Sequence, residues 1–511
     1  MDLSTLHRAL SAIVGEANLS VDPEARDLAT SDIFAWPRRR PALAVVRPGS
    51  TAEIAAVVKA LAAASIAIVP RGAGLSYTGG MAVEQDAVVV ETTRLSEISI
   101  DEDGLVAVIG AGASWEQVAE ALKPLGLRSR QPSPISGARS TVGGLASQGL
   151  PAGTDGILGL TVVLPSGEVV RTGASASPVR SVPDLTGTFL GDCGAFGIKT
   201  EVVLRLERSP SVEFASYDFD DVEKLVTALS TCMREGVASR AFAMDQAKTR
   251  QAASVDGVDA VGAALSVMRD AGSLAGAARS AAKLVGFAVS RPAALWSLHL
   301  TIESVTPEGA KAQLRRVREI CGRLGDETSD VFPRTLHSKP YSVRGMVGPE
   351  GERWVPVHGI FRPRDAAEAM RRLRKFLDDR AEILSKAGIT SSWLLSSSGP
   401  YVLIEPMLYW RDSLDPLHLK YLSGRNRERF GSFAPVPAVR DVVRELRQGL
   451  RDEMDALGAV HCQIGRFYNL EQQQADGSFG ELRKLKAQVD PAGLLNPGVL
   501  GLDQEPAKAR T

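Results

Sequence analysis

A glycine-rich loop between two short apolar runs constrains the fold of this chain more than any other feature. The loop follows the apolar run 66–69, which predicts a buried strand, and it reads Pro70-Arg71-Gly72-Ala73-Gly74-Leu75-Ser76-Tyr77-Thr78-Gly79-Gly80. Because glycine has no Cβ, several backbone N–H groups can converge on one concavity, and such a nest binds phosphate without a side-chain charge. The sequence therefore predicts a site for a cofactor that contains a diphosphate.

A dinucleotide-binding Rossmann unit is the obvious alternative. Gly72 and Gly74 follow a strand, and Glu91 ends the next apolar run, 87–90. A Rossmann unit needs a crossover helix between its two strands, but only residues 80–86 separate the glycines from the second run. We therefore expect the loop to connect neighbouring strands directly. An ordinary glycine-rich hairpin stays open as the simplest alternative.

Further motifs follow the glycine loop in an ordered series. A helix over 51–64, which Ser50 could N-cap, follows the segment 46–50. The other motifs are a small-residue loop at 140–144, a hairpin over 159–170, the glycine-rich segments 184–187 and 191–201, and the C-terminal segment 489–498. This series resembles the vanillyl-alcohol oxidase / p-cresol methylhydroxylase (PCMH) family of flavoproteins, and the resemblance covers nearly the whole chain.

The resemblance implies an α+β fold: a PCMH-type FAD-binding module of two α+β subdomains, and a cap domain with an antiparallel sheet covered by helices. It also implies FAD as the cofactor. The residues that it assigns to FAD are Pro70, Arg71, Gly72, Ala73, Gly74, Leu75, Ser76, Thr78, Gly79, Pro132, Ser140, Thr141, Gly143, Gly144, Gly194, Gly197, Ile198 and Asn496.

The pattern of apolar runs, glycine-rich turns and helices along the chain predicts where these domains begin and end. We expect an N-terminal helical segment over 1–42, the FAD-binding domain over 43–207, the substrate or cap domain over 208–438, and a C-terminal return to the FAD domain over 439–511. An alanine-rich insertion over 252–294 reads as helices packed on the cap. A peripheral membrane or partner surface is the alternative for this insertion, because basic residues alternate there with apolar ones.

Bulk properties exclude some classes of protein. The net charge of −1 gives no sign of a nucleic-acid partner. We expect neither a signal peptide nor a membrane-spanning helix, because residues 1–17 carry charges at helical spacing and no long uncharged apolar run occurs. The four cysteines are widely spaced, which favours reduced thiols and a cytoplasmic protein. We expect a homodimer.

The catalytic residues are harder to predict, because the family has two branches. The D-2-hydroxy-acid dehydrogenase branch carries a histidine-based metal motif. Here Ser398 and Glu405 stand where its two histidines would be, and His461 replaces a later glutamate. The resemblance therefore implies no metal site, although Glu405 and His461 could form a metal site with fewer ligands.

The phenol-oxidising branch holds a phenolate with tyrosines and an arginine. His461 occupies the place of that arginine, and Arg344 and Arg466 are the candidates to substitute for it. Members of the branch often carry covalent flavin, and Tyr401 lies near one tethering position. Leu75 stands at the tethering histidine of other relatives, so we expect noncovalent FAD.

We therefore predict an FAD-dependent oxidoreductase that takes a hydride from an alcohol or 2-hydroxy-acid carbon of a small organic substrate. The candidate catalytic residues are His461, Arg344, Glu405, Tyr409 and Arg466. His461 is favoured as base or oxyanion partner, because histidine titrates in the useful range. A purely structural role for His461 and core packing for Tyr409 stay open.

Three alternatives remain for the function. They are oxidation of a para-substituted phenol, a role as the flavin subunit of a glycolate-oxidase-like complex, and nonenzymatic FAD binding. The electron acceptor, whether oxygen, a quinone or a cytochrome, is not predicted.

Overall fold

The computed structural model describes residues 3–34, 39–82, 84–129, 136–151, 153–173, 183–253, 294–338, 340, 347–422, 424–430 and 433–503, without the side chains of 250–253 and 425. The chain divides into two compact units. The first unit comprises Met1–Arg208, Asp415–Lys420 and Cys462–Thr511, and the second comprises Ser209–Leu414 and Tyr421–His461.

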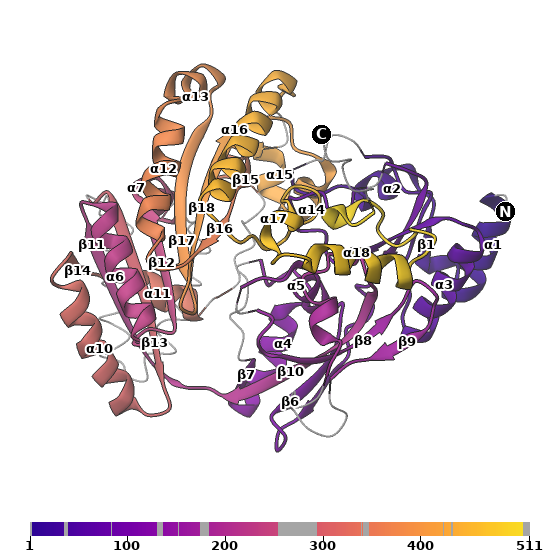
Figure 1. Ribbon diagram of the computed structural model, residues 1–511, viewed down its shortest axis with the longest axis horizontal. Helices are drawn as coiled ribbons and strands as arrows, with labels where there is room; N and C mark the ends of the chain where they lie inside the picture. Colours follow the sequence, from indigo (N-terminus) through magenta and orange to yellow (C-terminus); the bar gives the residue numbers. More distant parts are fainter. Residues whose placement is uncertain are drawn as a thin grey trace. The chain divides into compact units, whose positions relative to one another are not determined.

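The first unit begins with a mainly parallel sheet, in the strand order β1-β2-β4-β3. Its elements have the indigo colours of the start of the chain in Figure 1. The strands are β1 (Leu19–Ser20), β2 (Ala44–Val46), β3 (Ala67–Arg71) and β4 (Ala87–Glu91). Three helices belong to this part of the chain: α1 (Leu3–Val14), α2 (Pro23–Ala29) and α3 (Thr51–Ala63). The predicted cap of α3 is present, because Ser50 Oγ accepts the Glu53 N–H at 3.1 Å.

The connection between β3 and β4 decides between the alternatives for the glycine loop. The two strands are neighbours, as expected, and they pair in parallel. The described residues between them contain no helix. The prediction that the loop joins neighbouring strands directly is confirmed. The hairpin alternative is wrong, because a hairpin joins antiparallel strands.

A second, antiparallel sheet completes the first unit, in the strand order β5-β6-β10-β8-β9, with β7 paired to β10. Its strands are β5 (Ile98–Asp101), β6 (Val106–Gly110), β7 (Leu127–Ser129), β8 (Ile157–Val163), β9 (Val169–Arg171) and β10 (Ile198–Arg208). β8 and β9 form the predicted hairpin. Helices α4 (Trp115–Leu122) and α5 (Val142–Gln148) lie in the connections.

The C-terminal return segment lies directly beside β3. The Ile68 N–H donates to Leu494 O at 2.7 Å, and the Asn496 N–H donates to Ile68 O at 2.7 Å. Ile68, which precedes the glycine loop, is thus tied to a segment more than four hundred residues later in the chain. α18 (Ser478–Val489) precedes this segment, and the short α17 (Leu470–Gln473) lies before α18.

The second unit is built on a large antiparallel sheet, in the strand order β14-β11-β13-β12-β17-β18-β15, with β16 paired to β18. Its strands are β11 (Ser211–Phe219), β12 (Arg240–Asp245), β13 (Trp296–Ser304), β14 (Asp326–Thr328), β15 (Arg353–Pro356), β16 (Gly359–Phe361), β17 (Thr390–Ser397) and β18 (Val402–Trp410). This is the expected antiparallel cap sheet. β12 and β17 were not predicted.

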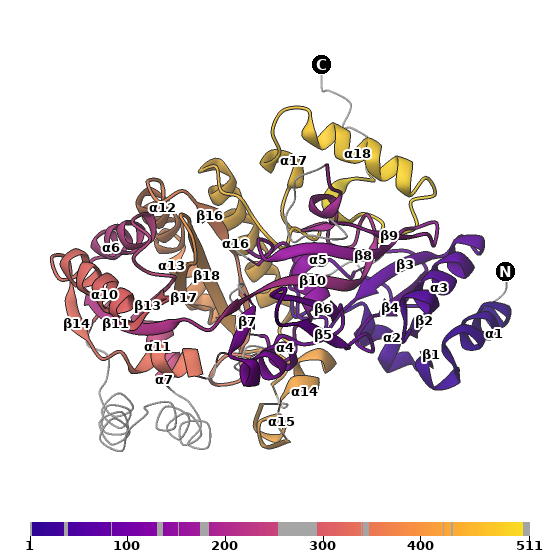
Figure 2. The ribbon, with the colours of Figure 1, turned by 90° about the horizontal axis from the view of Figure 1, so that it is seen from below.

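Helices lie on both faces of this sheet (Figure 2). In that view α6 (Val222–Arg234) and α12 (Ala366–Asp378) lie on one side of the strands. The short α7 (Gln246–Ala253) and α11 (Val331–Ser338) lie on the other side. Four further helices of the second unit are α10 (Pro307–Cys321), α13 (Ala381–Ala387), α15 (Gly424–Phe430) and α16 (Pro437–Ala456).

Two boundaries differ from the sequence prediction. The N-terminal helix α1 buries Leu6, Leu10 and Val14 in the core of the first unit, where the prediction had a separate segment. Helix α16 belongs to the second unit, so the final return of the chain to the first unit begins at Cys462, where the prediction had 439. The physical reason is packing on α12: Phe376 lies 2.5 Å from where a Cβ on Gly449 would stand.

No helix in the described part of the chain is long and apolar enough to span a membrane. All four cysteines are buried and unpaired by disulfides. The alanine-rich insertion over 252–294 lies almost entirely outside the described residues, so the prediction made for it stays a prediction.

Candidate functional site

The backbone of the glycine loop presents hydrogen-bond donors that nothing nearby accepts. Four of its N–H groups donate to no residue in the described ranges: those of Gly72, Gly74, Leu75 and Ser76. Gly74 takes a φ of +81°, a left-handed conformation that favours glycine. Unpaired donors of this kind are rare in proteins, so the loop is built to bind an acceptor-rich group.

These donors line a pocket formed by three loops of the first unit. The first is the glycine loop, the second contains residues 140–144, and the third contains residues 191–199. The pocket holds about 950 Å³ of empty space, part of it at its opening to solvent. The predicted cofactor residues that line it are Pro70, Arg71, Gly72, Ala73, Gly74, Leu75, Ser76, Ser140, Thr141, Gly143, Gly144, Gly194, Gly197 and Ile198.

Two buried side-chain atoms in the pocket wall also point to a polar ligand. Ser140 Oγ and Gln148 Oε1 are buried, and neither has a hydrogen-bond partner among the described residues. Leaving a buried polar atom unpaired costs about 1–3 kcal/mol, which a polar ligand in the pocket would recover. Gln148 was not predicted, because nothing in its local sequence separates it from an ordinary helix residue.

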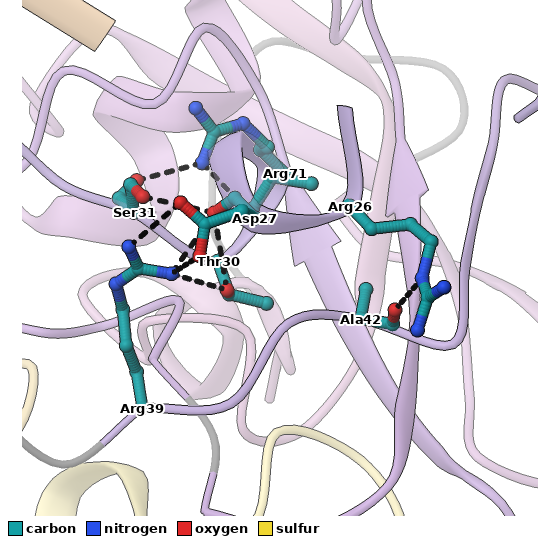
Figure 3. A network of polar contacts seen from close by, with 8 residues as sticks. Arg26, Asp27, Thr30, Ser31, Arg39, Ala42 and Arg71 are labelled. Carbon is teal, nitrogen blue, oxygen red and sulfur yellow. Dashed lines mark hydrogen bonds and ion pairs between the residues drawn. The ribbon is translucent and has the colours of Figure 1, made fainter. Parts of the chain in front are cut away.

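The Arg71 side chain extends from the start of the glycine loop to the backbone around the end of α2 (Figure 3). Its guanidinium donates to Ala29 O at 2.8 Å and to Ser31 O at 3.0 Å, just after α2. A Cβ on Gly74 would lie only 2.0 Å from this guanidinium. The Arg71 side chain therefore fixes the shape of the loop, while the loop backbone presents the donors.

The same view shows how the segment around α2 is held. Arg39 forms a two-pronged ion pair with Asp27, at 2.7 and 3.0 Å, and it also donates to Thr30 Oγ1 at 3.2 Å (Figure 3). Arg26 donates to Ala42 O. These contacts keep the carbonyl groups that receive Arg71 in place.

The second loop uses its glycines for close packing. The Gly143 N–H donates to Ala111 O at 2.9 Å, and a Cβ there would lie 2.6 Å from the Ala111 side chain. The Gly144 N–H donates to Thr141 Oγ1, which caps α5. The resemblance assigned both glycines to FAD. In the structure both already have acceptors, so these glycines shape the pocket wall.

The third loop adds a buried ion pair that was not predicted to act at the site. Lys199 forms it with Asp192, which also accepts the Gly194 N–H at 2.8 Å and the Phe196 N–H at 3.3 Å. Lys199 lines the pocket. Its position directly after the predicted Gly197 and Ile198 is the signal that could have revealed it.

Two side chains of the C-terminal return segment, Cys462–Thr511, connect the loops around the pocket. Asn496 is fully buried and donates to Gly80 O at 2.9 Å and to Cys193 O at 2.8 Å. Arg466 donates to Gly79 O at 3.1 Å and to Pro497 O, and burial lowers its pKa. Asn496 and Arg466 thus join the loops to one another. Thr78 and Gly79 flank this junction and do not line the pocket.

A second buried lysine anchors α18 to the same region. Lys486 Nζ donates to Ala195 O at 2.9 Å, to Leu495 O at 2.8 Å and to Asp490 Oδ2 at 2.6 Å. Asp490 in turn accepts the Leu495 N–H at 2.9 Å. The third loop therefore depends on residues of the return segment for its position.

In the second unit, Glu405 and Tyr409 lie on the same face of β18, four residues apart. Burial raises the pKa of the Glu405 carboxyl to about 7, and the charge of Lys248 partly offsets this effect. Some of the Glu405 side chain remains accessible, and it has no hydrogen-bond partner in the described residues. A carboxyl with these properties can exchange a proton near neutral pH.

Tyr409 contacts a lysine that sequence reasoning missed. Lys248 Nζ, from the first turns of α7, lies 3.1 Å from Tyr409 Oη and 3.4 Å from Met407 Sδ. Ser392 on β17 donates to Tyr409 Oη at 3.2 Å. Lys248 precedes the alanine-rich insertion, and no local pattern there indicates a partner 161 residues away.

His461, the favoured catalytic candidate, has both ring nitrogens beside acceptors. Nδ1 lies 2.6 Å from His358 O, and Nε2 lies 2.7 Å from Asp455 Oδ1 at the end of α16. The ring is buried. This geometry favours the structural alternative, in which His461 holds the segment that follows α16. The catalytic role stays a prediction.

His299, for which the sequence offered no context, lies in a buried polar chain on the same sheet face. Its Nδ1 is 2.9 Å from Ser216 Oγ, and its Nε2 is 3.2 Å from Ser297 Oγ. Burial lowers the pKa of His299 to about 3, so the ring is neutral. Phe332 packs against it at 4.5 Å between ring centroids.

Two predicted site residues, Pro132 and Arg344, lie outside the described residues. Within the described ranges, no group of three or more His, Cys, Asp or Glu side chains is placed to hold a metal ion. Ser398, at the position of a metal-binding histidine in the hydroxy-acid branch, instead pairs with Tyr401 Oη at 2.8 Å.

Comparisons with known sequences find a family match for the part of the chain that contains the glycine loop. Residues 42–173 match the family described as "FAD binding domain". The chain is 29% identical over 232 residues to an uncharacterized FAD-linked oxidoreductase of Mycobacterium tuberculosis, covering 43% of this chain and 50% of that protein. It is 32% identical over 179 residues to the glycolate oxidase subunit GlcD of Bacillus subtilis, covering 33% and 38%.

The match to a D-lactate dehydrogenase of Archaeoglobus fulgidus is similar, at 29% identity over 178 residues, covering 33% of this chain and 40% of that protein. The alignments thus span about half or less of the length of these curated relatives.

Comparisons with solved structures extend over nearly the whole chain. Substrate-bound p-cresol methylhydroxylase superposes with a TM-score of 0.71 at 16% identity, covering 98% of this chain and 97% of that one. The 4-ethylphenol oxidase from Gulosibacter chungangensis gives a TM-score of 0.70 at 16% identity, with the same coverage. At this identity the likeness shows the fold, and it confirms the predicted α+β architecture.

Proposed function

Because this chain belongs to the PCMH-type FAD-binding oxidase family, we propose that it transfers a hydride from an alcohol or 2-hydroxy-acid carbon of a small organic substrate to FAD. That it is an FAD-linked oxidoreductase rests on the comparisons. The choice of donor carbon and the roles of individual residues are our proposal.

The observation that carries the proposal is the set of unpaired amides in the pocket. The N–H groups of Gly72, Gly74, Leu75 and Ser76 would hold the FAD diphosphate, whose oxygens accept several hydrogen bonds at once. Ser140 Oγ and Gln148 Oε1 would gain partners from the polar parts of the cofactor. The residues present therefore fit FAD.

When bound, FAD supplies an isoalloxazine ring that accepts a hydride from carbon. The protein must hold the ring, exclude water and take the proton that leaves the substrate oxygen. Glu405 is suited to take this proton, because its raised pKa of about 7 keeps a useful fraction of base at neutral pH. We propose that FAD is held without a covalent bond, since Leu75 lies in the pocket where some relatives carry a tethering histidine.

Two alternatives have support of their own. Oxidation of a para-substituted phenol is favoured by the whole-chain likeness to p-cresol methylhydroxylase and 4-ethylphenol oxidase. A role as the flavin subunit of a larger complex is favoured by the sequence likeness to GlcD. The hydroxy-acid proposal draws on the same likeness and on that to D-lactate dehydrogenase.

The visible spectrum of the purified protein, before and after acid precipitation, tests the cofactor. We expect flavin bands that move to the supernatant. Flavin that stays in the pellet would contradict noncovalent binding, and a protein that takes up no FAD would overturn the proposed function.

Anaerobic titration then tests the donor. Bleaching of the flavin by 2-hydroxy acids or aromatic alcohols is the expected result. Bleaching only by para-alkylphenols would select the phenol alternative, and an active isolated protein would count against an obligate complex.

A further inference from the structure

A cluster of hydrogen-bond donors lies on one face of the sheet in the second unit. This is the face that carries Glu405, Tyr409 and His299, and we call it the polar face. Its donors are Lys248 Nζ, Tyr409 Oη and Ser392 Oγ, and its nearest acceptor besides Tyr409 itself is the thioether of Met407. The side chains of Tyr409 and Ser392 are buried, at 3% and 0% exposure, and that of Lys248 is partly exposed. The three residues come from α7, β17 and β18, so the fold alone brings them together.

The donors of this cluster have few strong acceptors among the described residues. Tyr409 Oη lies within hydrogen-bonding distance of Lys248 at 3.1 Å and of Ser392 at 3.2 Å, and its own proton is directed to Met407 Sδ at 3.4 Å. Lys248 also uses this sulfur, again at 3.4 Å. A thioether is a weak acceptor, so the Tyr409 proton lacks a good partner. The one oxygen acceptor of the Lys248 ammonium among the described residues is Tyr409 Oη, which also accepts from Ser392.

The ammonium of Lys248 also has no anionic partner in the described part of the chain. No carboxylate oxygen there lies within 4.0 Å of its Nζ. Other lysines of the same unit are paired: Lys224 with Asp220, Lys375 with Asp379 and Lys386 with Glu382. Those pairs are exposed to solvent, whereas Lys248 stands beside buried side chains, where a missing counter-charge costs more.

A proton acceptor lies two residues from Met407 on the same strand face. This is Glu405, about 7 Å along the strand at its usual rise per residue. Its carboxyl feels the charge of Lys248, but the two do not form an ion pair in the described structure. The face therefore presents donors at one place and an unpaired carboxyl nearby.

We propose that Lys248, Tyr409 and Ser392 bind an anionic oxygen of the substrate, a carboxylate or a phenolate, and so orient its CH–OH group toward Glu405. The anion supplies the acceptor that the cluster lacks. This inference rests on the proposed function, because it names the substrate class of that reaction. The proton of the substrate O–H group would pass to the Glu405 carboxylate, and FAD, when bound, would supply the acceptor for the hydride that leaves the carbon.

Binding of unreactive probes to the oxidised holoenzyme tests the anion site without requiring turnover. Phenylacetate and its neutral isostere phenylacetamide probe carboxylate recognition. Phenol and anisole probe phenolate recognition, and a near-ultraviolet difference spectrum reports whether bound phenol is ionised. Isothermal titration calorimetry gives each dissociation constant.

In the wild-type protein, one of the two anions should bind at least about ten-fold more tightly than its neutral counterpart, the usual size of a charge-assisted hydrogen bond. Lys248→Met should remove this preference and leave the neutral probe unchanged. Lys248→Arg should keep most of it, and Tyr409→Phe should weaken it by a smaller factor.

Lys224→Met is the matched control, because Lys224 is an exposed lysine of the same unit and pairs only with Asp220 in a surface ion pair. It should bind all four probes as the wild type does. FAD content and thermal melting of each variant show that the fold is kept.

The possible results separate this inference from the proposed function. Equal binding of the anions by Lys248→Met and wild type would overturn the anion site, even if hydroxy acids reduce the flavin. Wild-type protein that binds the anions no better than their neutral isosteres would also overturn it. Lys248-dependent anion binding in a protein whose flavin no donor reduces would keep the site and overturn the proposed oxidation.

Discussion

The pocket of the first unit and the polar sheet face of the second differ in what they offer a ligand. The pocket presents backbone amides. Glycines shape the loop that carries these amides, and the Arg71 guanidinium packs against it. The sheet face presents side chains, those of Lys248, Tyr409 and Glu405. A backbone site leaves a signature in the sequence, because only glycine permits it. A side-chain site uses residue types that are common along the chain, so its members are recognised only once the fold brings them together.

The largest expected effect is on the backbone site. Gly74→Val should abolish FAD binding, because its Cβ would collide with the Arg71 guanidinium and valine disfavours the φ of +81°. Flavin absorbance per protein should fall to near zero. Gly187→Ala is the matched control in the same unit, since a Cβ there meets nothing within 4 Å. Full flavin occupancy in Gly74→Val would refute the assignment of the loop.

The next effect is on the side-chain site. Glu405→Gln should slow flavin reduction by about 10²- to 10⁴-fold, the usual contribution of a positioned base, while FAD content stays the same. The wild-type rate should rise with pH and level off above the carboxyl pKa of about 7, and the variant should show no such rise. Stopped-flow reduction measures both.

The exposed Glu382 is the control for this substitution, because it pairs only with Lys386 at the surface. Glu382→Gln should leave the rate and its pH dependence unchanged. A Glu405→Gln protein that reduces its flavin at the wild-type rate would remove Glu405 from the chemistry.

A smaller effect concerns stability. Burial raises the folded-state pKa of Glu405 above its unfolded value, so the stability that the protonated carboxyl contributes is complete below about pH 4.5 and is lost as pH rises through about 7. At pH 8, Glu405→Gln should therefore raise the free energy of unfolding by roughly 1–3 kcal/mol. At pH 4 the difference should vanish. Urea denaturation at the two pH values checks this, and a gain that is equal at both would rule out the electrostatic cause.

The smallest catalytic effect is expected at His461. His461→Ala should lower the free energy of unfolding by about 1–3 kcal/mol, because Asp455 and His358 O lose their partner. Flavin reduction should change little. Asp455→Asn should give a similar loss, and the double variant should lose little more. A stable His461→Ala protein with slowed reduction would instead support the catalytic role predicted from the sequence.

Local signals explain what could be predicted in the fold. The helix over 51–64 is α3, with Ser50 as its cap, and the apolar run 401–410 is β18. β17 was missed because serines make up half of Thr390–Ser397, and serine usually marks loops. Ser392 donates to Tyr409 Oη on the neighbouring strand, and Ser397 lies within hydrogen-bonding distance of the Gly399 and Tyr401 carbonyl oxygens, contacts that only the fold reveals.

The same distinction explains the site residues. The glycine loop, Ser140 and Gly197 were found because motifs carry them, and they line the pocket. Lys248 was missed because its partner Tyr409 is 161 residues away and the two are linked only through the sheet. The partners of His461 were equally hidden, since Asp455 and His358 approach it from different elements.

The return segment has a consequence for the timing of assembly. Asn496 and Lys486 hold the loops around Cys193 and Ala195, yet both are made after the whole second unit. During synthesis, the residues that complete the pocket of the first unit therefore follow those of the second unit. We expect the cofactor site to be completed late, so that FAD binds to a chain whose second unit has already been made.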